Sequence, residues 1–91
     1  MGSADVSTKS QGDSFPVRVP IKVIGREGIL DPAAIASIIF DRIGEQDRTG
    51  WHSKKKGTFV SHTFWIQIPD LEMEANIRKA VHELPGVVMQ L

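Results

Sequence analysis

Residues 15–25, FPVRVPIKVIG, carry the pattern that most limits what this chain can fold into. Successive side chains of a β-strand point to opposite faces of the sheet. In a strand here, one face would hold Val17, Val19, Ile21 and Val23, and the other Arg18, Pro20, Lys22 and Ile24. A strand with one apolar and one partly charged face predicts a sheet with one buried and one open side.

Residues 58–68 repeat the alternation over a greater length and predict a second long strand. One face would hold Val60, His62, Phe64, Ile66 and Ile68, and the other Phe59, Ser61, Thr63, Trp65 and Gln67. The polar stretch 50–57 predicts a short edge strand that turns at Lys56-Gly57, because lysines protect an edge strand from pairing with other chains. Residues 87–91 predict a last strand.

Two helices are expected between these strands. Asp31 and Pro32 mark the start of the first helix as N-cap and first helical residue, and Gly44 ends it. The second helix follows Pro69-Asp70 and ends at Pro85-Gly86. The expected apolar stripes are Ile35, Ile38, Ile39 and Ile43 in the first helix and Leu71, Ile77, Ala80, Val81 and Leu84 in the second.

The order β-α-β-β-α-β defines the expected fold class. Right-handed crossovers put both helices on one face of a four-stranded antiparallel sheet with strand order 4-1-3-2. We therefore predict an α+β, ferredoxin-like sandwich formed by residues 15–91 as a single domain. Residues 1–14 are small and polar, and we expect a flexible N-terminal tail there.

Composition argues against several function classes. The 91 residues include 11 basic and 11 acidic side chains, so no net charge attracts nucleic acid or membrane. No cysteine is present, which excludes thiolate chemistry and fits a cytoplasmic location. The three histidines lack ligand spacing, and no serine is expected to meet a histidine and a buried carboxylate. We expect no metal, no cofactor and no enzymatic activity.

Three segments resemble the YbeD-like family of small uncharacterised bacterial proteins. They are FPVRVPIKVIG at 15–25, SKKKGTFVS at 53–61 and the ending LPGVVMQL at 84–91. The sequence departs from the family pattern at Val17, Val19 and Phe59, where Cys, Phe and Tyr are usual. The resemblance implies a ferredoxin-like fold close to ACT regulatory domains, and it implies no established reaction.

A glycine loop follows the first strand and is a candidate ligand site. The turn Gly28-Ile29-Leu30 is similar to the turn beside the small-molecule site of ACT domains, although the Asp-Arg-Pro that often precedes it is absent. Gly25 and Gly28 could also leave backbone amides free for an anion at the following helix. The alternative is that both glycines only serve the strand-to-helix turn.

The open sheet face is the candidate partner surface. Strand alternation puts Arg18, Lys22, Phe59 and Trp65 on that face, and we predict that they form one patch. Aromatic residues and arginine often anchor interfaces. We therefore expect a non-enzymatic regulatory or adaptor domain that binds a protein partner, a second copy of itself or a small metabolite. The alternative is that single aromatics on this face merely shield the sheet.

A nucleic-acid-binding module is the competing hypothesis. It would use the basic hairpin at Lys54, Lys55 and Lys56 together with the open face. The aromatics do not have the spacing of an RNA-recognition motif, and Gly25-x-x-Gly28 does not join two helices as in a KH domain. Nucleic acid is therefore the less favoured partner.

Overall fold

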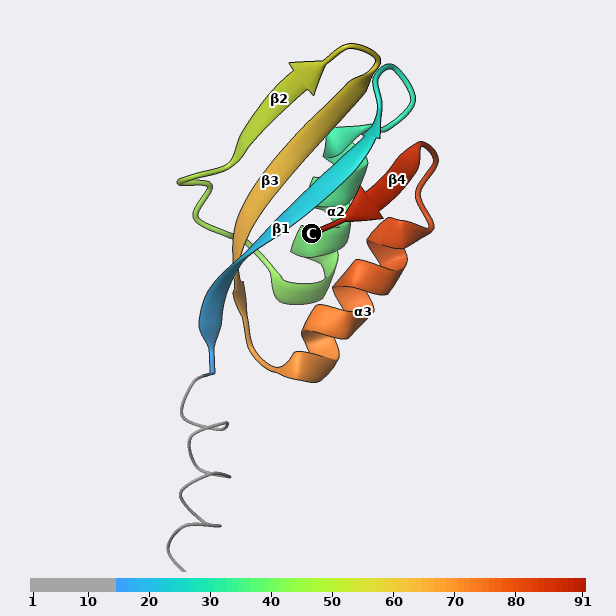
Figure 1. The fold of residues 1–91 in the computed structure, drawn as a ribbon. Helices are drawn as coiled ribbons and strands as arrows, with labels where there is room; N and C mark the ends of the chain where they lie inside the picture. The colour runs from blue at the N-terminus through green and yellow to red at the C-terminus, as the bar shows by residue number, and fades with distance from the viewer. Residues whose placement is uncertain (1–14) are drawn as a thin grey trace, which may run out of the picture.

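The computed structural model describes residues 15–91, and the tail predicted for residues 1–14 lies outside this range. Within it, four strands and two helices follow the predicted order (Figure 1). Their bounds are β1 Val17–Arg26, α2 Pro32–Ile43, β2 His52–Lys56, β3 Phe59–Ile68, α3 Leu71–His82 and β4 Val87–Gln90.

The four strands form one antiparallel sheet in the order β2-β3-β1-β4. This is the predicted order 4-1-3-2 in reverse, and with the element order it matches a ferredoxin-like topology. Figure 1 shows α2 and α3 packed against the same face of the sheet. The other face of the sheet has no helix over it in residues 15–91.

Both helices begin at the predicted caps. Asp31 Oδ1 accepts a hydrogen bond from Ala33 N at 3.0 Å, and Pro32 occupies the first helical position. Asp70 Oδ1 accepts from Met73 N at 2.7 Å. Each carboxylate satisfies an amide that the first helical turn leaves unpaired. These caps fix where the two crossovers leave the sheet.

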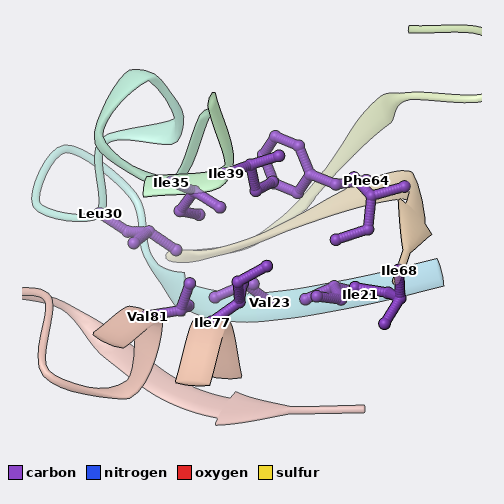
Figure 2. Packing of buried hydrophobic residues seen from close by; sticks show 10 residues of the cluster. Ile21, Val23, Leu30, Ile35, Ile39, Phe64, Ile68, Ile77 and Val81 are labelled. Atoms are coloured by element: carbon purple, nitrogen blue, oxygen red, sulfur yellow. The ribbon is translucent and has the colours of Figure 1, made fainter. Parts of the chain in front are cut away.

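The core lies between the sheet and the two helices, as Figure 2 shows. The inner faces of β1 and β3 meet the stripes of α2 and α3 there, so the predicted strand faces are confirmed. The fully buried side chains are Ile21, Val23, Ile35, Ile39, Ile66, Ile68, Ile77 and Val81.

The prediction that Leu71 belongs to the apolar stripe of α3 is wrong. Its side chain is 54% exposed, whereas Met73 packs against the core. At 100° per residue, Leu71 lies about 120° around the helix from Ile77, and Met73 lies only about 40° from it. The inward stripe therefore begins at Met73.

Pro20 lies within a central strand, where a missing N–H usually disrupts the sheet. Lys22 exchanges backbone hydrogen bonds with Leu91, so Lys22 faces β4. Pro20, two residues earlier, faces the same edge, but β4 pairs with β1 only from Val23 to Gly25. The missing N–H thus points to an edge where no described strand lies, and Pro20 breaks no ladder bond.

Candidate functional site

The strand register defines the open face of the sheet residue by residue. Paired residues of neighbouring strands lie on the same face. The open face therefore carries His52, Lys54 and Lys56 of β2, Phe59, Ser61, Thr63, Trp65 and Gln67 of β3, Arg18, Pro20, Lys22, Ile24 and Arg26 of β1, and Met89 of β4. This assignment includes the four residues predicted for the partner surface.

Charge is strongly segregated between the strands and the rest of the domain. All six charged side chains in the four strands are cationic: Arg18, Lys22, Arg26, Lys54, Lys55 and Lys56. Every acidic residue of the described chain lies in a helix, a cap or a loop. Five of the six strand cations are on the open face, so this face is basic although the whole chain is neutral.

Trp65 marks one end of the open face and is partly covered by the chain before β2. The Arg18 guanidinium lies 5.9 Å from the Trp65 ring centroid and donates to the carbonyl of Thr49. Gly50 packs so closely on Trp65 that a Cβ there would lie 2.8 Å from its Cδ1. Hydrogen bonds from Thr49 hold this loop and lower the pKa of Asp47. Trp65 is thus half-buried within its own domain.

Phe59 marks the opposite end of β3. It is six residues from Trp65, or roughly 20 Å along a strand. Its ring is 40% exposed and has the Arg26 guanidinium 5.4 Å from its centroid. Lys22 lies between the two ends, paired with Thr63. Arg18, Lys22, Phe59 and Trp65 therefore share a face but do not form one cluster. Trp65 is paired with Arg18 at one end and Phe59 with Arg26 at the other, and Lys22 lies between the two pairs.

A groove of about 560 Å³ occupies the Phe59 end of the open face. It is lined by Lys22, Ile24, Lys54, Lys56, Gly57, Phe59, Val60 and Ser61. Within residues 15–91, none of its three lysines has an ion-pair partner. Lys55, on the other face of β2, pairs with Glu27 at 2.7 Å. The groove thus combines apolar surface with three unneutralised ammonium groups, and we call it the hairpin groove.

The Gly25–Gly28 loop offers few free donors. The amides of Arg26 and Glu27 bond to the carbonyls of Gly86 and Thr58, and those of Ile29 and Leu30 both bond to the carbonyl of Arg26. Gly28 has φ +83°, which an L side chain rarely adopts. Gly25 is instead needed for close packing, because a Cβ would lie 2.5 Å from the Gly86 carbonyl oxygen. This geometry is that of a turn held by internal hydrogen bonds.

Ser53 and His62 form a pair that sequence reasoning did not expect. Ser53 Oγ lies 2.6 Å from His62 Nδ1, and His62 is buried. The turn at Gly57 and Thr58 pairs Lys56 with Phe59, which puts Ser53 opposite His62. A two-residue loop after Lys56 was the signal that could have revealed this pair. His62 Nε2 has no hydrogen-bond partner among the described residues, so no carboxylate completes a triad.

Burial lowers the pKa of His62, and the charge of Asp31 opposes this only in part. The folded protein therefore binds this proton less readily than the unfolded chain does. The free energy of unfolding should fall as the pH drops below about 6.5 and should keep falling toward the lowered folded pKa. The slope of stability against pH in denaturant melts measures this effect.

His62→Gln should flatten that slope, whatever its effect on absolute stability, because it removes the titrating group. Equal slopes for the wild type and His62→Gln between pH 7 and 5 would contradict this assignment.

Trp51 is half-buried and packs against the core, a role that the polar surroundings of its segment concealed. Its ring packs edge-on against Phe64 with centroids 4.9 Å apart and lies beside Phe40 at 6.0 Å. Its Nε1 donates to the carbonyl of Trp65 at 2.8 Å. Arg48 stacks over the Trp51 ring. Trp51 thus packs over the edge of the core just before β2 and also lines a shallow pocket there, beside Arg48 and His52.

Residues 15–91 contain neither a metal-binding cluster nor a membrane-spanning helix. Among residues 15–91, no group of His, Cys, Asp and Glu is arranged to hold a metal ion. In the same residues, neither helix has the length and apolarity required to cross a membrane.

These features define a small α+β domain of ferredoxin-like topology with a basic, partly apolar open sheet face. Residues 12–91 match the model of DUF493, a family described as protein of unknown function, and the chain belongs to that family. No curated protein matches the chain significantly. No solved structure does so either.

Proposed function

We propose that this protein is a non-enzymatic regulatory or adaptor domain that binds a protein partner through its open sheet face. The observation that carries the proposal is the exposed apolar surface on this face. Phe59 is 40% exposed and Met89 47% exposed, on strands at opposite sides of β1. Exposed apolar surface rimmed by polar side chains is typical of interaction sites.

The resemblance to YbeD-like proteins and to ACT domains supports a regulatory role in the cytoplasm, and the cysteine-free sequence fits that location. Aliphatic side chains favour a protein over a nucleic acid as the partner. Nucleic-acid bases stack on aromatic rings. In the row of residues that crosses the middle of the open face, however, Ser61 of β3 is paired with Ile24 of β1, and Ile24 is paired with Met89 of β4, so this row has no aromatic ring. The five cations of the face are the observation that favours nucleic acid as the second candidate.

Site-specific photo-crosslinking of the full chain in its native cells tests the proposal. A photoreactive amino acid is placed at position 59, at position 89 or, as control, at position 71. Leu71 is a suitable control because it is more exposed than either test position but lies on a helix, away from the sheet face. We expect the same identified protein to be captured from positions 59 and 89 and not from position 71.

The captured protein must then bind the purified full chain. Phe59→Ala should weaken that binding by roughly tenfold, as expected for an aromatic anchor, and Leu71→Ala should not. Equal capture from all three positions, or capture of RNA and no protein from positions 59 and 89, would contradict the proposal.

A further inference from the structure

We infer that the hairpin groove binds an extended acidic segment of a protein, with carboxylates at alternate positions beside an apolar anchor. This inference deepens the proposed function by naming the chemistry of the partner, and it rests on that function. It is carried by the arrangement of three lysines around the apolar side chains of Ile24 and Phe59.

The cations are free and regularly spaced. Lys54 and Lys56 lie two residues apart on the same face of β2, or roughly 6–7 Å along the strand. Alternate residues of an extended peptide have the same spacing, so two carboxylates at positions i and i+2 match the two ammonium groups. Lys22 lies across the groove on β1 and can neutralise a third acidic group.

The floor of the groove is apolar, so we expect it to select a ligand by apolar contact as well as by charge. On β1 and β3, each apolar side chain of the floor is paired with a small or a cationic one. Ile24 lies opposite Ser61, and Phe59 lies opposite Arg26. An aliphatic or aromatic anchor would bury apolar surface against Ile24 and Phe59 while its acidic neighbours remain near the rim. Burial of an anchor in a pocket with charges at its edge is typical of energetic hot spots.

A second copy of this chain fits the groove less well than an acidic partner. Packing two open faces together would place the cations of one copy against the cations of the other. Acidic residues are available on the helical side, for example Glu72 of α3. A contact between helical side and sheet face is head-to-tail and does not close into a dimer.

A random twelve-residue peptide library displayed on phage and selected against the full chain tests the inference without presupposing a sequence. We expect enriched peptides with Asp or Glu at alternate positions next to a Leu, Ile or Phe. A labelled enriched peptide is then titrated in 50 and 200 mM salt, with a U-rich RNA oligonucleotide of equal length as a second probe. The peptide should bind more tightly than the RNA at both salt concentrations.

The three adjacent lysines of β2 provide a matched control. The double change Lys54→Gln and Lys56→Gln should weaken peptide binding by roughly tenfold, because both groups face the groove. Lys55→Gln should change it by less than about twofold, because that lysine lies on the other face and pairs with Glu27. Phe59→Ala should weaken binding by roughly tenfold as well.

The inference would be overturned by no enrichment, by enrichment of neutral or basic peptides, or by tighter binding of RNA than of peptide. Equal effects of Lys55→Gln and of the Lys54→Gln and Lys56→Gln double change would also overturn it, as would concentration-dependent oligomers that block the peptide. Any of these results combined with continued crosslinking from positions 59 and 89 would reject the acidic segment and leave the proposed function standing. Loss of crosslinking as well would reject both.

Discussion

Ile77→Ala should lower the free energy of unfolding by about 2–5 kcal/mol, the usual effect of truncating a fully buried aliphatic side chain to alanine. Ile77 has no exposed surface and lies at the centre of α3, facing the sheet (Figure 2). Its removal deletes three carbon atoms from the core and leaves a cavity that neither the sheet nor α2 can fill without shifting. Chemical denaturation of the full chain measures the change.

Leu71→Ala in the same helix is the matched control. It removes a side chain of similar size, but Leu71 is 54% exposed, so we expect a loss below about 1 kcal/mol. Similar losses for the two variants would show that the faces of α3 are assigned wrongly. A smaller loss for Ile77→Ala than for Leu71→Ala would have the same meaning.

Gly25→Ala should be similarly damaging for a different reason. A Cβ at Gly25 would lie 2.5 Å from the carbonyl oxygen of Gly86 and 2.5 Å from Leu30 Cδ2. The first neighbour is backbone and cannot rotate away, so β1 and the turn before β4 must separate. We expect a loss of about 2–4 kcal/mol, in the range of overpacked core sites.

Gly28→Ala separates this steric effect from backbone strain. Gly28 has φ +83°, but a Cβ there would meet nothing within 4 Å. The expected loss is the cost of a left-handed residue, about 1 kcal/mol. If Gly25→Ala proved as mild as Gly28→Ala in the same denaturant melts, close packing would not be the reason for a glycine at position 25.

Strand faces and helix caps could be predicted from the sequence because they depend on local periodicity. Val23 and Phe64 are buried, as the period of two requires. Asp31 and Asp70 cap their helices because the side chain reaches amides only two or three residues away. The topology followed from the element order and the handedness of crossovers.

The candidate site was harder to predict because it depends on distances between segments. The alternation of β3 puts Phe59 and Trp65 on one face, and their six-residue separation, already visible in the sequence, puts them near its opposite ends. The cations that stack on each ring come from the neighbouring strand β1. Burial of Trp65 under the loop at Gly50 involves residues with no periodic pattern. The pairing of Ser53 with His62 required the hairpin register, which the two-residue turn could have supplied.

The basic face was concealed by the equal numbers of acidic and basic residues in the whole chain. Sorting the charges by predicted strand would have revealed it, because the predicted strands already contained lysines and arginines and no acidic residue. Net charge describes how a protein behaves at long range, whereas a binding face depends on where the charges are.

The cationic strands and the net acidic charge of the helices, caps and loops make the domain an electric dipole with almost no net charge. Such a molecule is neither strongly attracted nor repelled at long range, but a nearby charged surface exerts a torque on it. An anionic partner would turn the open face toward itself before contact, and would turn the helical side away. At physiological salt this torque is screened over about 8–10 Å, so it acts only in the last steps of the encounter. It therefore raises the fraction of encounters in which the open face meets the partner, and it does not speed the approach itself.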